Sequence, residues 1–154
     1  MTTTTKKSLL KIHDHYRERV NSCLDSFLSS IPSSPNSDIE LRDVMKYSVL
    51  AGGKRFRPIL TYTVASLYDS EIEKADSCAS AIELIHIYSL IHDDLPAMDD
   101  DDIRHNQPAN HKVFGEAQAI LAGDGLQALA FSLISNDLLI DSDTKIKLLE
   151  LMAS

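Results

Sequence analysis

Cysteine is scarce in this sequence, and its scarcity limits the kinds of site that the chain can hold. Two cysteines occur among 154 residues, Cys23 and Cys78, and neither lies in a paired metal-ligand spacing. Structural zinc sites need such pairs, so the sequence argues against zinc. Two cysteines far apart are also typical of a reduced compartment, and we expect a cytoplasmic protein.

Long apolar runs are equally rare. Near the N-terminus, Lys11, His13 and Asp14 interrupt any run of signal-peptide length. No segment approaches the roughly 20 apolar residues of a membrane span. The sequence therefore predicts neither a signal peptide nor a transmembrane helix.

Basic residues are outnumbered by acidic ones. The chain has 15 Lys and Arg against 23 Asp and Glu, which gives a formal net charge of −8. Such a charge disfavours phosphate backbones and anionic lipids. We therefore expect neither nucleic acid nor an anionic membrane as a partner.

Strand patterns and internal repeats are missing, whereas apolar residues recur at the three- and four-residue spacing of helices. A chain of 154 residues is long enough for one domain with one core. We expect an all-α helical bundle. The expected helices are Ser8–Leu28, a helix from the Ser37–Glu40 capping box to Gly52, Arg57–Tyr68, a helix from the Ser70–Glu73 capping box through Asp93, a helix after Lys112 through Ser135, and one from Asp143.

An acidic cluster is the most informative feature that is present. Six carboxylates fall within residues 93–102, directly after a helical stretch with core-facing spacing. Blocks of like charge are usually solvated, but a block that follows a core helix indicates a ligand. Hard oxygen donors suit Mg²⁺ or Mn²⁺, and Mg²⁺ takes one or two carboxylates together with substrate phosphates. The cluster therefore predicts a site for metal and diphosphate.

Two alternatives explain the cluster less well. An EF-hand loop counted from Asp99 would need glycine where Arg104 stands and glutamate where Asn110 stands. A solvated acidic loop would be the favoured interpretation if the cluster stood alone.

Pro96 explains the spacing within the cluster. Asp93 and Asp99 are six residues apart and would lie on opposite faces of an unbroken helix. Proline interrupts the helix and disfavours helical geometry at Leu95. We expect residues 95–98 to bulge and to return Asp99 to the metal beside Asp93, while residues 100–102 have no assigned role.

A basic turn precedes the acidic cluster in the chain. The segment Gly52–Pro58 ends one helical pattern and begins another. Lys54 and Arg57 project roughly 60° from each other on a helical turn, so they can bind one anion together. We expect Arg55 to point elsewhere, as a surface charge. For this segment alone, an ordinary basic turn is the simpler interpretation.

Two histidines lie on the helix that leads to the cluster. His86 precedes Asp93 by seven residues, or two turns, and therefore faces the same way. We expect His86 to contact the diphosphate. His92 lies on a neighbouring face and is expected to be an ordinary core histidine.

Three ordered motifs resemble the trans-prenyl diphosphate synthase family, most closely its bacterial-type farnesyl diphosphate synthases. The motifs are Gly52–Pro58, Ile85–Asp102, and Phe114–Glu116 followed by Ala119–Asp124. The resemblance implies a helical bundle of the isoprenoid synthase type. It also implies a Mg²⁺-dependent condensation, in which an allylic diphosphate (dimethylallyl or geranyl) ionises and isopentenyl diphosphate attacks the carbocation.

The resemblance implies roles for individual residues. Asp93 and Asp99, supported by Asp94, would hold the Mg²⁺ ions that bridge the allylic diphosphate. Arg104 matches the family arginine that binds the same diphosphate, and its planar fork suits phosphate oxygens. Isopentenyl diphosphate would be bound by a second set of residues, which are Lys54, Arg57 and His86.

The sequence departs from the family pattern directly after Arg104. The family has a second arginine and a glycine there, whereas this chain has His105 and Asn106. The missing arginine ordinarily helps to bind isopentenyl diphosphate. We therefore expect weaker and more pH-dependent binding through His105, because an unperturbed histidine is mostly neutral at pH 7.

Product length in the family depends partly on residues just before the first aspartate. Tyr88 stands five residues before Asp93, and an aromatic residue there resembles the farnesyl-producing members. Ser89 is small and lies more nearly under Asp93. We expect a farnesyl product, with a geranylgeranyl diphosphate synthase as an alternative and a plain core tyrosine as the other interpretation of Tyr88.

The chain carries only part of the family pattern. A second aspartate-rich motif and a lysine pair have no counterpart after Asp124. We interpret residues 1–154 as the N-terminal portion of a single prenyl synthase domain and expect no turnover by this chain alone. Uncovered apolar helix faces predict association, as a homo-oligomer or with a separate C-terminal fragment. A silent regulatory subunit and a class I terpene cyclase are the alternatives from other classes.

Overall fold

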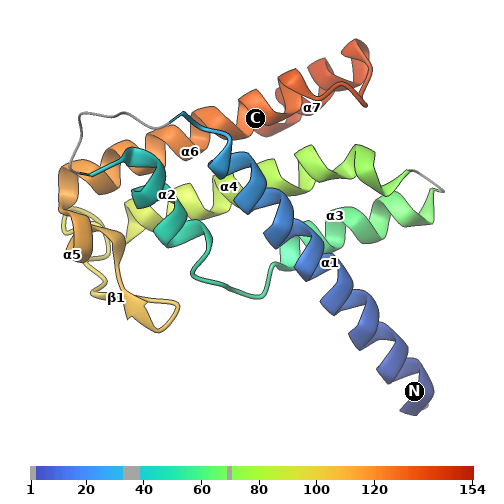
Figure 1. The fold of residues 1–154 in the computed structure, drawn as a ribbon, viewed down its shortest axis with the longest axis horizontal. Helices are drawn as coiled ribbons and strands as arrows, with labels where there is room; N and C mark the ends of the chain where they lie inside the picture. Colours follow the sequence, from blue (N-terminus) through green and yellow to red (C-terminus); the bar gives the residue numbers. More distant parts are fainter. Residues whose placement is uncertain (1–2, 33–38, 69–70) are drawn as a thin grey trace.

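The computed structural model describes residues 3–32, 39–68 and 71–154, and these form a helical bundle, which confirms the all-α prediction (Figure 1). The helices are α1 (Thr3–Ser29), α2 (Leu41–Val49), α3 (Phe56–Leu67), the 3₁₀ helix η1 (Ile72–Ala75), α4 (Asp76–Asp93), α5 (Asn110–Phe114), α6 (Glu116–Asn136) and α7 (Ser142–Ala153). A short hairpin, β1 (Ile103–Arg104) with β2 (Gln107–Pro108), lies between α4 and α5.

Helices α4 and α6 form the centre of the bundle and pack along one another (Figure 1). Leu84 of α4 and Leu126 of α6 are fully buried in the shared core. The helices α1 and α3 pack on α4, whereas α2 and α5 pack mainly on α6. The acidic loop and the hairpin therefore follow the C-terminal end of α4, a helix that other helices contact on several sides.

One partly buried polar contact joins the first half of the bundle. Asp76, the first residue of α4, accepts hydrogen bonds of 2.7 Å from both Nε and Nη2 of Arg19 on α1. It also accepts a 2.8 Å hydrogen bond from the hydroxyl of Tyr62 on α3, a fully buried side chain. This carboxylate thus ties α1 and α3 to the start of α4.

The helix starts differ from the expected capping boxes. Glu40 precedes α2 with an extended backbone and no capping hydrogen bond, so it is not the third helical residue that a capping box requires. The long helix begins only at Asp76, because a turn of 3₁₀ helix comes first. Ser37 and Ser70, the expected capping residues, lie outside the described residues.

The hairpin was not predicted, and the expectation of a chain without strands was wrong at this point. Its loop consists of His105 and Asn106, with φ of 51° and 64°. Positive φ at both central residues is the geometry of a two-residue type I′ turn, in which asparagine is readily tolerated. Strands of two residues are too short to produce the alternating pattern by which strands are recognised.

Helix α6 is long and apolar enough, by length and composition alone, to cross a membrane. This differs from the expectation that no segment approaches that length. A core helix can pass the same test, and α6 buries Ala122, Leu126 and Ile134 in the core.

Several apolar side chains remain uncovered, as the sequence predicted. On α3 the exposed residues follow the three- and four-residue spacing of one helix face, and they are Phe56, Leu60, Val64 and Leu67. On α7, Ile146 and Leu151 are exposed. What covers these faces in the cell stays a prediction.

Candidate functional site

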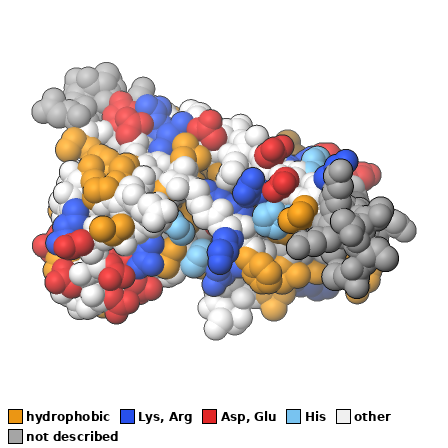
Figure 2. All heavy atoms as spheres, turned by 90° about the horizontal axis from the view of Figure 1, so that it is seen from below, with side chains coloured by type: hydrophobic (Ala, Val, Ile, Leu, Met, Phe, Trp, Pro, Cys, Tyr) orange, Lys and Arg blue, Asp and Glu red, His pale blue; other side chains and the backbone are white. Residues whose placement is uncertain are grey.

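A basic pocket lies between the beginning of α3 with the loop before it, helix α4 and the turn of the hairpin. It has a volume of about 500 Å³. The residues that line it include four of the predicted diphosphate-binding residues, which are Lys54, Arg57, His86 and His105. They come from the loop before α3, from α3, from α4 and from the hairpin turn. Figure 2 shows histidine and basic side chains gathered near the middle of one face, with a group of acidic side chains at one end.

The loop between α2 and α3 gives the pocket one wall. Gly52 and Gly53 have φ of 99° and 115°, a backbone region that residues other than glycine rarely adopt. The ring of His105 lies close to Gly53, with Cε1 3.5 Å from the position that a side-chain carbon would take there. The glycines therefore turn the chain sharply after α2, and the histidine of the hairpin packs against that turn.

Arg55 is buried, and the expectation that it is a surface charge was wrong. Its guanidinium donates to Oε1 of Glu83 at 2.9 Å, to Oδ1 of Asn21 at 2.9 Å and to the carbonyl oxygen of Val49 at 2.5 Å. The three acceptors belong to α4, α1 and α2. Sequence spacing around the basic turn could not reveal partners that lie so far away in the chain.

The side chains of Lys54 and Arg57, on either side of Arg55, are exposed at the pocket. Within the part of the chain that the structure describes, neither side chain has an ion-pair or hydrogen-bond partner. Two cations for which the described residues offer no acidic partner therefore face one cavity. Such an arrangement favours an anion as the occupant.

His86 is half-buried on α4 and shares the pocket with these cations. Burial lowers the pKa of His86 below its ordinary value of 6.5, and the positive charge of Arg57 lowers this pKa further. These surroundings thus favour the neutral ring. An anion with several negative charges would reverse this balance, because it stabilises the protonated imidazole.

The acidic loop turns back on itself directly after α4. The amide of Asp99 donates a 2.8 Å hydrogen bond to the carbonyl oxygen of Asp93, the last residue of the helix. The amides of Met98 and Asp100 both donate to the carbonyl oxygen of Leu95, at 2.8 and 3.1 Å. The backbone of Asp99 is therefore held beside the end of α4, where Asp93 is half-exposed and Asp99 exposed.

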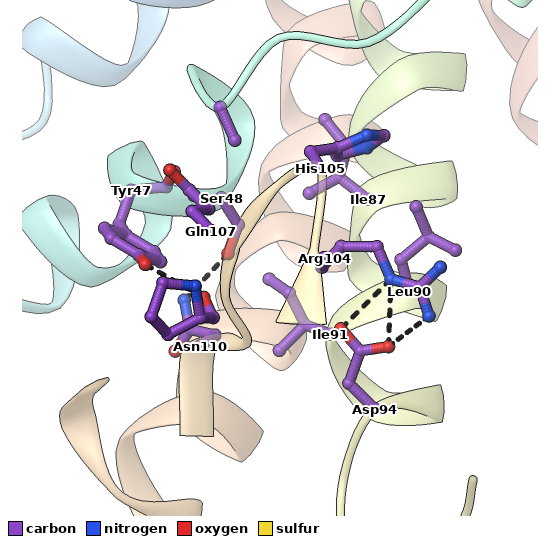
Figure 3. A pocket seen from close by; sticks show the side chains of 12 residues that line it. Tyr47, Ser48, Ile87, Leu90, Ile91, Asp94, Arg104, His105, Gln107 and Asn110 are labelled. Atoms are coloured by element: carbon purple, nitrogen blue, oxygen red, sulfur yellow. Dashed lines mark hydrogen bonds and ion pairs between the residues drawn. The ribbon is translucent and has the colours of Figure 1, made fainter. Parts of the chain in front are cut away.

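Asp94 has a different environment from its neighbours. It is buried, and its carboxylate accepts hydrogen bonds from Nε of Arg104 at 3.0 and 3.2 Å and from Nη2 of the same residue. These hydrogen bonds raise the pKa of Arg104 above its ordinary value. Figure 3 shows the two side chains pointing toward one another, from β1 and from the end of α4.

The acidic cluster is compatible with a metal that arrives with a phosphate ligand. No group of three histidine, cysteine or acidic side chains that could hold a metal ion occurs among residues 3–32, 39–68 and 71–154. Asp94 is turned toward Arg104, which leaves the half-exposed Asp93 and the exposed Asp99 as the candidate oxygen donors. Two carboxylates with the remaining positions open to water and phosphate fit the preferences of Mg²⁺.

Two further aspartates of the cluster have structural partners that the sequence did not suggest. Asp101 accepts a 2.9 Å hydrogen bond from Nη2 of Arg104. Asp102 forms a 2.7 Å ion pair with Lys112, which lowers the pKa of this exposed carboxylate. These contacts hold the end of the loop that leads into the hairpin.

The hairpin that carries Arg104 is anchored to α2 by residues that sequence reasoning missed. The hydroxyl of Tyr47 donates to the carbonyl oxygen of Pro108 at 2.9 Å. Nδ2 of Asn110 donates to the carbonyl oxygen of Val44 at 3.0 Å. It also donates to Oγ of Ser48 at 2.8 Å (Figure 3). The cavity between them, of about 20 Å³, has room for roughly one water molecule.

The remaining predicted residues lie on α4. Tyr88 makes an edge-on ring contact with His92, with 5.0 Å between ring centroids. His92 shares a 3.1 Å hydrogen bond between Nε2 and the carbonyl oxygen of Ile120, which confirms its expected structural role. Ser89 lines a mostly apolar groove of about 460 Å³ between α4 and α7, and this groove shares Arg57 and His86 with the basic pocket.

Known proteins of one family resemble this chain in sequence. The Polyprenyl synthetase family model matches residues 38–154. The farnesyl diphosphate synthase of Escherichia coli (strain K12) is 48% identical over 119 residues, which are 77% of this chain and 39% of the relative. Geranylgeranyl pyrophosphate synthase 12, chloroplastic, of Arabidopsis thaliana is 52% identical over 102 residues, 66% of this chain and 28% of the relative.

The fold has the same relatives. A crystal structure of geranyltransferase from Legionella pneumophila superimposes with a TM-score of 0.84 at 42% sequence identity, over 94% of this chain and 49% of that one. The chain thus spans less than half of the length of these three relatives. With the basic pocket and the acidic loop on one helical scaffold, the matched residues identify the chain as a member of the polyprenyl synthetase family.

Proposed function

We propose that this chain forms the diphosphate- and metal-binding part of a short-chain trans-prenyltransferase that condenses isopentenyl diphosphate with dimethylallyl or geranyl diphosphate to give farnesyl diphosphate. One observation carries the proposal. Lys54, Arg57 and His86 line one pocket, and the carboxylates of Asp93 and Asp99 lie at the end of the helix that carries His86.

The allylic diphosphate would bind at the acidic loop. Asp93 and Asp99 would hold Mg²⁺, or Mn²⁺, which supplies charge neutralisation for the departing diphosphate. Arg104 would donate hydrogen bonds to the same diphosphate, and Asp94 would orient that guanidinium rather than contact the metal. This assignment rests on the burial of Asp94 and its hydrogen bonds to Arg104.

Isopentenyl diphosphate would bind in the basic pocket. Lys54 and Arg57 supply two positive charges there, and His86 gains a proton when the multiply charged anion arrives. His105 lines the same pocket and would add a weaker, pH-dependent contact. These residues bind and orient the second substrate, while its double bond attacks the carbocation at the acidic loop.

Product length is the finer part of the proposal. The names of the relatives include both farnesyl and geranylgeranyl synthases, so geranylgeranyl diphosphate is the second candidate product. Tyr88 and Ser89, five and four residues before Asp93 on α4, would set the depth of the pocket for the growing chain. Enlarging this pocket with Tyr88→Ala is then expected to lengthen the product.

A chimera tests the proposal. Residues 38–154 would replace the matching region of the Escherichia coli farnesyl diphosphate synthase, and incorporation of isopentenyl diphosphate would be measured with dimethylallyl and geranyl diphosphate. We expect Mg²⁺-dependent formation of farnesyl diphosphate. Asp93→Ala and Lys54→Ala should each reduce turnover by roughly a hundredfold or more, whereas Lys147→Ala, an exposed change on α7, should not. A folded but inactive chimera, with the parent enzyme active in the same assay, would contradict the proposal.

A further inference from the structure

The buried ion pair between Arg55 and Glu83 lies in the wall of the basic pocket, and the proposed chemistry does not use it. The side chains of Arg55 and Glu83 are 2% and 5% exposed, and their charged atoms are 2.9 Å apart. A buried pair of this kind often contributes little net stability, because both ions lose their water. Its position relative to the pocket therefore matters more than its strength.

Arg55 has an unusual backbone for its residue type. It lies in the left-handed region, with φ 50° and ψ 35°, at the position just before the first residue of α3. This conformation is unfavourable for a residue with a Cβ atom. The hydrogen bonds of its side chain to Asn21, Glu83 and the carbonyl of Val49 hold the residue there.

This contact fixes the cations on both sides of Arg55. Lys54 precedes it in the loop and Arg57 follows it in the first turn of α3, and neither has another side-chain anchor within the described residues. Glu83, in turn, is one helical turn before His86 on α4. The ion pair thus joins the segment that carries the two cations, the loop and the first turn of α3, to the helix that carries the histidine.

The pair also removes a negative charge from the pocket wall. Glu83 is among the residues that line the pocket. An unpaired carboxylate there would repel a diphosphate, whereas the guanidinium of Arg55 neutralises it at 2.9 Å.

From these contacts we infer that Arg55 and Glu83 are positioning residues, which set the placement of Lys54 and Arg57 relative to His86 and thereby the affinity of the pocket for a diphosphate group. The inference rests on the proposed function for the identity of the anion. The ordering of the loop does not depend on that identity. The two parts can therefore be tested separately.

The test compares the unaltered 154-residue chain with the double variant Arg55→Met/Glu83→Met. Replacing both ions with apolar side chains of similar size avoids an unpaired buried charge, so the free energy of unfolding should change little. Two properties should change. The ¹⁵N order parameters of Gly53 and Lys54 should fall from about 0.85 to below about 0.6, and the Kd for inorganic diphosphate should rise roughly tenfold.

Two further variants separate positioning from general stability. Arg55→Lys keeps the charge but can reach fewer of the three acceptors, so it should give intermediate values and remains informative if the double variant does not fold. Arg19→Met removes the ion pair with Asp76, which joins α1 to α4 away from the pocket. It should lower stability and leave both the loop order parameters and the Kd for diphosphate unchanged.

The outcomes are distinct. Unchanged order parameters in a folded double variant, or an unchanged Kd with a disordered loop, would overturn the inference. Failure of the unaltered chain to bind inorganic diphosphate would instead contradict the proposed function, while the order parameters would still decide whether Arg55 and Glu83 position the loop.

Discussion

The contact between Asp94 and Arg104 gives a stability prediction whose size follows from burial. Asp94→Asn keeps the shape of the side chain but removes its charge and turns one acceptor into a donor that faces the guanidinium. Breaking a fully buried ion pair costs about 3–5 kcal/mol. The side chain of Asp94 is 3% exposed, but that of Arg104 is 34% exposed and can regain water.

We therefore expect the free energy of unfolding to fall by about 2 kcal/mol, less than for a fully buried pair and more than the 0–1 kcal/mol of a surface pair. Urea denaturation at pH 7, followed by far-UV circular dichroism, measures the change from the shift in midpoint at constant slope. Typical domains have about 5–15 kcal/mol of stability, so the variant should remain folded.

The matched control is Asp101→Asn. Asp101 contacts the same guanidinium at 2.9 Å, but its side chain is 52% exposed, so its loss should cost less than about 1 kcal/mol. Equal losses for the two variants would refute the reasoning, because burial would then not determine the strength of the contact.

Four further outcomes are expected. Gly123→Ala should destabilise the chain, because its new carbon would lie 2.2 Å from the His92 ring. In a His92→Ala background the same change should add about 1 kcal/mol of stability, because alanine has the higher helix propensity. An equal effect in both backgrounds would contradict this contact. Because the pKa of His86 is lowered in the folded state, that state binds fewer protons than the unfolded state. The free energy of unfolding should therefore rise with pH between the pKa of His86 in the folded state and 6.5. His86→Gln should flatten this slope in urea titrations at several pH values. Burial raises the pKa of Cys23 from 9.0 to about 11, so alkylation by iodoacetamide at pH 8 should be roughly a hundredfold slower in the folded chain than in urea. In the chimera, His105→Arg should lower the Michaelis constant for isopentenyl diphosphate at pH 8, and no improvement there would reject the assigned role.

The sequence predicted the helical class and the main motifs because these depend on local spacing. The pattern of apolar residues before Asp93 is that of a core helix, and α4 ends at Asp93. Pro96 predicted a break, and the hydrogen bond from Asp99 to Asp93 closes a turn there. Local spacing was sufficient for each of these features.

The errors concern contacts between distant parts of the chain. Arg55 was taken for a surface charge because its partners, Asn21 and Glu83, lie 34 and 28 residues away. The contact of Asp94 with Arg104 was not predicted either, because the burial of Asp94 depends on how α4 meets the hairpin. The hairpin itself left one signal in the sequence, the asparagine at position 106, which tolerates the left-handed backbone of a tight turn.

Helix α4 carries His86 in the basic pocket and Asp93 at the acidic loop, seven residues apart on one continuous helix. A continuous helix of this length keeps the two residues about 10.5 Å apart along its axis and on the same face. Substitutions between these residues leave this spacing unchanged. A single inserted or deleted residue would turn one position by about 100° relative to the other, so this stretch should tolerate changes of side chain far better than changes of length.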